Sequence, residues 1–221
     1  MSESELRFGL IGTGRIGQVH AATLAHVSGA TLARVTDAVP AGADRIALQY
    51  GATPMASAEA LIASDDLDAV IIASPTPTHL EFIDACIDVG MPVLCEKPID
   101  LDIARVEALR SKVLKSSVPV ALGFNQRFDP GFAEVKRRIL DGEIGTPEHV
   151  TIVSRDPGPP PPEYLAVSGG IFRDMTIHDF DMARFLLGDI VEVSAFGSRL
   201  FDDGAREFGD YDTVNVMLRS R

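Results

Sequence analysis

The stretch LRFGLIGTGRIGQVHA, residues 6–21, decides the fold. It opens with a mostly apolar run, 6–11, which predicts a β-strand, and a helix-like pattern follows the glycines. Those glycines have the spacing GxGxxG, which between a strand and a helix is typical of dinucleotide binding, with the pyrophosphate at the start of the helix. The residues expected to contact the dinucleotide here are Gly12, Gly14, Arg15 and Ile16.

A carboxylate follows the next predicted strand, residues 30–36. Asp37 lies twenty residues after Gly17, about where an acid binds the ribose hydroxyls of a dinucleotide. Its charge would repel the 2′-phosphate of NADP, and Ala38 and Val39 offer that phosphate no basic partner. The pattern therefore predicts NAD as the cofactor. The alternative is a glycine-rich turn in an α/β domain that binds no nucleotide.

The composition is that of a globular protein, with 221 residues of which 46% are hydrophobic. A net charge of −12 argues against nucleic acid and anionic membranes as partners, since both would repel the chain. Residues 1–7 lack the apolar run of a signal peptide, and no run reaches membrane-spanning length, which predicts a cytoplasmic protein. Cys86 and Cys95 are expected to be buried free thiols, and no cluster offers three ligands for a metal.

Strands and helices alternate over the first part of the chain, which predicts a Rossmann-type, doubly wound parallel sheet. Further strands are expected at 53–55, 69–73, 93–95 and 118–122, and helices at 41–50, 57–62, 78–89 and 102–114. Ligands bind such sheets beyond the carboxyl ends of the strands. The loops expected there add Ser74, Thr76, His79, Glu96 and Lys97 to the cofactor contacts.

The pattern changes after Gly123, so residues 1–123 are expected to form an NAD-binding domain and 124–221 a partial α+β domain. Helices are predicted at 130–140 and 171–187, and strands at 149–155, 191–198 and 213–218. A proline-dense loop, 157–162, interrupts this part and is typical of polyproline II.

Lys97 ends a strand where the nicotinamide is expected. A lysine there can bind a substrate hydroxyl and favour the alkoxide that forms as hydride leaves. The alternative is an exposed lysine at a strand end. Pro98, in the turn after it, is a candidate for a cis peptide bond.

Asp174 and His178 lie four residues apart on the predicted helix 171–187, so they are expected to share one face. An imidazole oriented by a carboxylate is a proton acceptor near neutral pH. The alternative is a solvated pair on a helix surface. The remaining histidines outside the cofactor loops, His20, His26 and His149, are expected at the surface or in packing.

Several stretches together resemble the Gfo/Idh/MocA oxidoreductase family, and in particular its inositol dehydrogenase branch. They are GLIGTGRIGQVHA (9–21), SPTPTHLEF (74–82), CEKPI (95–99), GFNQRFDP (123–130) and SGGIFRDMTIHDFDMARFLLG (168–188). The stretch SRDPGPPPPEY (154–164) resembles that branch rather than the family at large. The resemblance implies NAD-dependent oxidation of a ring hydroxyl of myo-inositol, or of a related cyclitol or sugar, with hydride transfer to nicotinamide C4.

In that resemblance His178 is the general base, Asp174 orients it, and Lys97 binds the same hydroxyl. Arg127 and Asp156 match positions that line the substrate pocket. The resemblance also implies an open, mostly antiparallel sheet in an incomplete second domain, and a homo-oligomer formed through it. Family members continue well past Arg221, so a truncated product, or completion by another chain, is expected. The alternatives are a dehydrogenase of another sugar or polyol and a non-catalytic dinucleotide-binding fragment.

Overall fold

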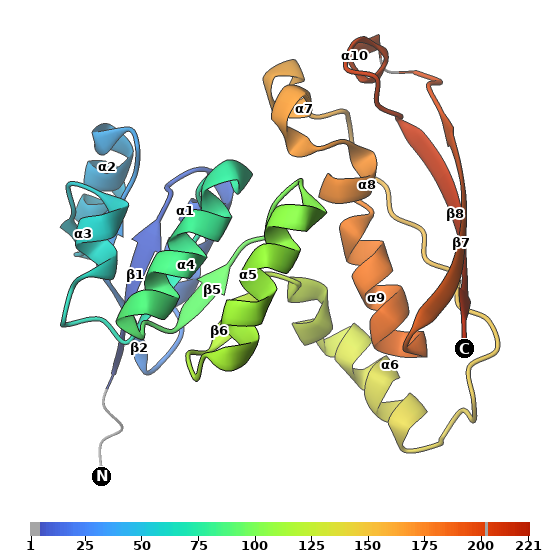
Figure 1. The fold of residues 1–221 in the computed structure, drawn as a ribbon, viewed down its shortest axis with the longest axis horizontal. Helices are drawn as coiled ribbons and strands as arrows, with labels where there is room; N and C mark the ends of the chain where they lie inside the picture. Colours follow the sequence, from blue (N-terminus) through green and yellow to red (C-terminus); the bar gives the residue numbers. More distant parts are fainter. Residues whose placement is uncertain (1–4, 202) are drawn as a thin grey trace. The chain divides into compact units, whose positions relative to one another are not determined.

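The computed structural model describes residues 5–201 and 203–221, and the chain divides into two compact units, Met1–Gly123 and Phe124–Arg221 (Figure 1). The first unit contains a six-stranded parallel sheet in the order β3-β2-β1-β4-β5-β6. Its strands are β1 (Leu6–Ile11), β2 (Ala30–Thr36), β3 (Thr53–Pro54), β4 (Ala69–Ile72), β5 (Val93–Cys95) and β6 (Val120–Leu122). The order reverses between β1 and β4, which is the arrangement of a doubly wound sheet. The predicted Rossmann fold is confirmed.

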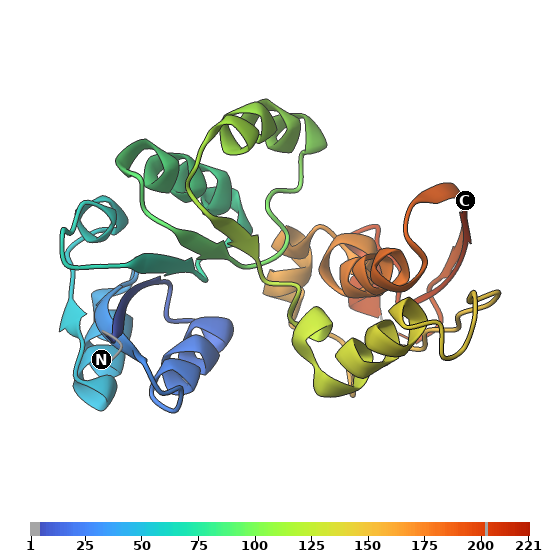
Figure 2. The ribbon, with the colours of Figure 1, turned by 90° about the horizontal axis from the view of Figure 1, so that it is seen from below.

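Helices cover both faces of this sheet, as Figure 2 shows. They are α1 (Arg15–Leu24), α2 (Pro40–Tyr50), α3 (Ala58–Ile62), α4 (His79–Val89) and α5 (Ile103–Lys115), with a short 3-10 turn, η1 (Thr76–Thr78). Local chemistry sets several of their ends: the Ser57 and Asp102 side chains accept the hydrogen bonds that begin α3 and α5, and left-handed Gly51 and Gly90 end α2 and α4.

The first unit has one hydrophobic core on each face of the sheet. Residues of β4 alternate between them: Val70 and Ile72 pack with α3 and α4, whereas Ile71 packs with α1 and α2. All three side chains are almost fully buried, and each such side chain contributes roughly 1.5–3 kcal/mol. A continuous β-branched strand is therefore stable only at the centre of the sheet. This position of β4 places the loop that follows it beside the glycine loop.

The second unit has a smaller sheet than the first and contains more helices than strands. Its elements are η2 (Asn125–Phe128), α6 (Pro130–Leu140), α7 (Pro162–Ser168), α8 (Ile171–Asp174), α9 (Ile177–Leu187), β7 (Ile190–Ser198), α10 (Asp203–Glu207) and β8 (Thr213–Ser220). Strands β7 and β8 form an antiparallel pair. Apolar side chains on this pair are solvent-exposed, among them Val193, Phe196 and Met217. The predicted α+β character and antiparallel sheet are confirmed.

Two predictions for the second unit are wrong. Residues 149–155 are not a strand. All of their side chains except that of Val150 are exposed, and no described strand pairs with them. A sequence rich in β-branched residues alone does not make a strand, because a strand needs a hydrogen-bonded partner. The predicted helix 171–187 is two helices, α8 and α9, separated at Met175 and Thr176. The short helices α7 and α10 were not predicted.

Candidate active site

The glycine loop between β1 and α1 has two glycines that the fold itself requires. Gly12 has a φ of +97°, and a Cβ atom there would lie 2.6 Å from the backbone of Ala73. A Cβ atom on Gly17 would lie 2.0 Å from the carbonyl oxygen of Gly12. Both positions therefore need glycine to let the loop pass close to β4 and the helix close to the loop.

Gly14 is different. A Cβ atom at this residue would have no described heavy atom within 4 Å outside its chain neighbours, and its φ of −63° is open to any residue. Gly14 is also the N-cap of α1, and no described side chain caps the helix there. The space and the N–H groups at this helix start suit a bound anion, and Arg15 follows in the first turn. These are the features that a pyrophosphate of a dinucleotide requires.

Asp37 follows β2 and binds the glycine loop. One carboxylate oxygen accepts hydrogen bonds from the Thr13 backbone N–H at 2.6 Å and the Thr13 hydroxyl at 2.8 Å, and the other accepts from Val39 N–H at 2.8 Å. Burial acts to raise the pKa of this carboxyl, but the hydrogen bonds from Val39 and Thr13 outweigh it and hold the pKa below its ordinary value. Asp37 is therefore charged and fixed beside the loop.

The loop after β4 contains a hydroxyl pair. The Ser74 and Thr78 hydroxyl oxygens lie 2.7 Å apart, and the Thr78 hydroxyl also donates to the carbonyl oxygen of Pro75. Thr76 begins η1 in the same loop. Ser74 and Thr76 thus lie at the carboxyl end of the sheet, where the cofactor contacts were predicted.

His79, predicted to contact the cofactor, is a buried residue that is only 1% exposed. Nδ1 lies 2.8 Å from the carbonyl oxygen of Pro98, and Nε2 lies 2.8 Å from the carbonyl oxygen of Ser74. Both ring nitrogens therefore face backbone acceptors inside the protein, and a nucleotide contact by His79 stays a prediction.

The turn after β5 carries Glu96 and Lys97. Glu96 lies 2.7 Å from Nε2 of His20, a residue of α1 that was predicted to be at the surface or in packing. A Cβ atom on Gly123 would lie 2.8 Å from a carboxylate oxygen of Glu96, so a larger residue there would displace this side chain. The Lys97–Pro98 peptide bond is cis, as predicted.

In the second unit, α8 ends at Asp174 and α9 begins at Ile177, just before His178. The Thr176 hydroxyl donates to the carbonyl oxygens of Ile171 and Phe172, which competes with the regular helical ladder. Met175 and Thr176 keep right-handed helical dihedral angles. The prediction that Asp174 and His178 lie on one continuous helix is therefore wrong, although the chain between them follows a helical path.

Asp174 has a partner that was not predicted. The phenol of Tyr164, at the end of the proline-dense stretch, donates to Asp174 Oδ1 at 2.7 Å. Asp210 holds the start of α8, because both of its carboxylate oxygens accept from the Ile171 N–H at 3.0 and 3.1 Å. The segment that carries Asp174 is thus fixed at its first turn and at its carboxylate.

Arg127 forms a fork with Asp181 of α9, with N–O distances of 2.7 and 2.6 Å. This hydrogen bonding raises the pKa of the guanidinium. The pair joins η2 to α9, a structural contact that the sequence did not reveal, and substrate binding by Arg127 stays a prediction. Asp156, the other predicted pocket residue, is exposed just before the proline-dense loop.

Two protein-family models together match this chain over almost its whole length. Residues 6–124 match the model described as "Oxidoreductase family, NAD-binding Rossmann fold", and residues 132–221 match the GFO/IDH/MocA C-terminal domain.

The chain belongs to the Gfo/Idh/MocA oxidoreductase family.

Several members of the Gfo/Idh/MocA family are close to this chain. Inositol 2-dehydrogenase of Rhizobium meliloti (strain 1021) is 50% identical over 97% of this chain and 65% of its own length. The crystal structure of a myo-inositol dehydrogenase from Corynebacterium glutamicum has a TM-score of 0.93 and 50% identity, covering 97% of this chain and 65% of that one. The Lactobacillus casei scyllo-inositol dehydrogenase with bound NAD(H) and scyllo-inositol has a TM-score of 0.83 and 28% identity, covering 99% of this chain and 67% of that one. The chain thus spans about 65% of the length of the first two.

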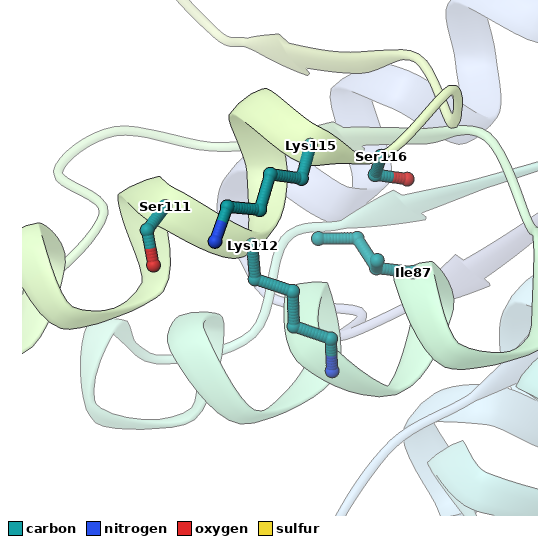
Figure 3. A pocket seen from close by; sticks show the side chains of 5 residues that line it. All are labelled: Ile87, Ser111, Lys112, Lys115 and Ser116. Atoms are coloured by element: carbon teal, nitrogen blue, oxygen red, sulfur yellow. The ribbon is translucent and has the colours of Figure 1, made fainter.

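Other features of this Gfo/Idh/MocA chain are weaker candidates for an active site than the loops at the carboxyl ends of the parallel strands. An open pocket is lined by Ile87 and by residues at the end of α5, including Lys112 and Lys115 (Figure 3). It lies at the opposite end of α5 from the β5 turn, and Lys112 is already paired with Asp84 and Asp88. Within residues 5–201 and 203–221, no cluster of three or more His, Cys, Asp or Glu suits a metal ion. No helix in those residues is long and apolar enough to cross a bilayer.

Proposed function

We propose that this chain carries the NAD-binding and catalytic residues of an inositol dehydrogenase. It would oxidise a ring secondary alcohol of myo-inositol, or of a related cyclitol, to the ketone. The observation that carries this proposal is the 50% identity, over 97% of the chain, to the Inositol 2-dehydrogenase of Rhizobium meliloti.

Residues 1–123 are the proposed NAD-binding domain. Gly12, Gly14, Arg15 and Ile16 would hold the pyrophosphate, and Asp37 would accept hydrogen bonds from the adenosine ribose. Ser74, Thr76, Glu96 and Lys97 would line the rest of the cofactor site. The open space at Gly14 and the charged state of Asp37 support these assignments. NAD, when bound, supplies the nicotinamide C4 that accepts the hydride.

The chemistry is assigned to three side chains. His178 would remove the hydroxyl proton as general base, which typically contributes about 100-fold to 10,000-fold in rate. Asp174 would orient the imidazole and stabilise its charged form, and the hydrogen bond from Tyr164 would in turn orient Asp174. Lys97 would bind the same hydroxyl and stabilise the developing alkoxide.

Residues 124–221 are the proposed substrate and oligomerisation domain. Arg127 and Asp156 would line the pocket for the polyol. The exposed apolar side chains of β7 and β8 support a homo-oligomer formed through this sheet. A cytoplasmic location fits an enzyme that uses NAD.

Turnover measurements test the proposal directly. Reduced cofactor is followed by absorbance with myo-inositol, scyllo-inositol and glucose, each with NAD and with NADP. We expect reduction of NAD with an inositol and little with NADP. Faster turnover with glucose than with either inositol would point to a sugar dehydrogenase of the same family.

A second function is favoured by one observation, the coverage of only 65% of the relatives' length. A chain of this span could bind NAD without turning over any polyol. Clear NAD binding by calorimetry, with no reduction of NAD by any of the three substrates, would support this reading and contradict the first.

A further inference from the structure

His79 is a buried polar residue whose structural contacts join two loops of the proposed cofactor site. It is the first residue of α4 and lies between the carboxyl ends of β4 and β5, which are neighbours in the sheet. Its two partners are the carbonyl oxygens of Ser74, after β4, and Pro98, after β5, each at 2.8 Å.

Carbonyl oxygens can only accept hydrogen bonds. In either neutral tautomer the ring therefore donates to one of the two loops, and the doubly protonated ring donates to both. Since the ring is 1% exposed, any N–H that it carries is directed at backbone rather than at solvent or a ligand. Removal of the ring leaves a carbonyl oxygen without its donor at this depth, which makes His79 a costly residue to remove.

The Pro98 contact falls immediately after Lys97. On the other side of Lys97, Glu96 is held by His20 at 2.7 Å, and its carboxylate accepts a hydrogen bond from the Lys97 backbone N–H. The main chain of Lys97 is thus fixed on both flanks, by His20 through Glu96 and by His79 through Pro98.

We propose that His79 is a positioning residue that fixes the Lys97–Pro98 turn against the loop after β4, and so sets the position of the Lys97 ammonium group. This inference rests on the proposed role of Lys97 in the dehydrogenase reaction. A displacement of a reacting group by about 1 Å can cost on the order of 100-fold in rate, so a residue remote from the chemistry can control it.

Two substitutions separate the two contacts of the ring. In His79→Asn the side-chain nitrogen takes approximately the place of Nδ1 and can still donate to Pro98. In His79→Gln it takes approximately the place of Nε2 and can still donate to Ser74. His79→Leu keeps apolar volume and removes the donor capacity of the ring. His26→Ala is the control, because His26 is exposed just after α1 and its ring lies against the carbonyl oxygen of Ala22.

The first readout is amide hydrogen exchange by mass spectrometry, which needs no turnover. We expect His79→Gln and His79→Leu to speed exchange in the segment 96–99, and His79→Asn to leave that segment nearly as protected as in the parent chain. The second readout is steady-state kinetics with NAD affinity by calorimetry. We expect kcat to fall by roughly 10- to 100-fold in His79→Gln and His79→Leu, less in His79→Asn, with NAD affinity nearly unchanged.

Equal protection of the segment 96–99 in the Asn and Gln variants would overturn the proposal, and so would equal kcat values. A loss confined to NAD affinity would instead make His79 a nucleotide contact. If His79→Leu does not fold, the Asn and Gln pair decides alone. If the parent chain shows no turnover, the proposed function fails, while the exchange comparison still decides whether His79 holds the Lys97 turn.

Discussion

At the scale of single residues, the loop between β1 and α1 contains two kinds of glycine. Some are required by the packing of the fold, and one has the open space that a ligand needs. Gly12 and Gly17 are surrounded so closely that a Cβ atom at either would overlap backbone. Gly14 has open space instead. The packing of the protein therefore does not require glycine at position 14, whereas the proposed approach of a ligand would.

Replacement of Gly14 by alanine should weaken NAD binding without destabilising the chain. The added methyl group meets no described atom within 4 Å, and its backbone angles suit alanine, so the free energy of unfolding should stay the same or rise by about 0.4–1 kcal/mol. NAD affinity, measured by calorimetry, should fall at least about tenfold because the methyl group enters the pyrophosphate space. Gly158→Ala, also in open space, is the matched control for stability. Unchanged NAD affinity in Gly14→Ala would contradict the proposal that the pyrophosphate binds at this loop.

Asp37→Asn should relax the preference for NAD over NADP. The amide keeps the size of the side chain but loses the charge that repels a 2′-phosphate, so the ratio of kcat/KM values for the two cofactors should fall at least about tenfold. Thr13→Val is the control, since it removes only the hydroxyl that donates to Asp37 and leaves the charge in place. A cofactor ratio that stays constant in Asp37→Asn, or changes equally in Thr13→Val, would contradict the role given to the carboxylate.

At the scale of elements, hydrogen bonds between neighbouring segments hold the candidate catalytic residues. His20 on α1 binds Glu96 after β5, His79 on α4 joins the loops after β4 and β5, and Tyr164 on α7 binds Asp174 at the end of α8. Each of these contacts links elements that are far apart in the sequence or separated by a turn. The site is therefore shaped by residues that carry no chemistry of their own.

The Glu96–His20 contact predicts a pH dependence of stability. Burial acts to raise the pKa of Glu96, but the hydrogen bond and charge of His20, with the Lys97 N–H, lower it below its ordinary value of 4.5. Its stabilising contribution is then fully present above pH 4.5 and is lost as the pH falls through the lower folded-state pKa. Urea unfolding from pH 7 down to pH 3 should show this loss in the parent chain and a shallower one in Glu96→Gln. Parallel curves for the two would refute it.

Tyr164→Phe should reduce turnover by freeing Asp174. The variant loses the phenol that donates at 2.7 Å but keeps the ring. We expect kcat to fall roughly 10- to 150-fold, the equivalent of about 1.5–3 kcal/mol for a hydrogen bond to a charged group, with little change in NAD affinity. Tyr50→Phe, in α2 of the first unit, is the matched control. A kcat equal to that of the parent chain would show that the phenol has no part in orienting Asp174.

At the scale of the whole molecule, the sequence predicts the first unit far better than the second. Continuous apolar segments such as 69–72 have one stable place, the centre of a parallel sheet, so the Rossmann fold and the glycine loop follow from local pattern. The break between α8 and α9 depends on the hydroxyl of Thr176, and the absence of a strand at 149–155 depends on pairing. The roles of His20 and His79 depend on contacts between elements, which no local pattern contains.

Replacement of His178 by alanine tests most directly the claim that this chain oxidises a polyol with an imidazole as its base. The measurement is the rate of NAD reduction by myo-inositol, together with NAD affinity by calorimetry on the same preparation. Turnover should fall by roughly 100-fold or more while NAD affinity stays nearly unchanged. Turnover close to that of the parent chain, or a loss of NAD affinity as large as the loss of turnover, would contradict it.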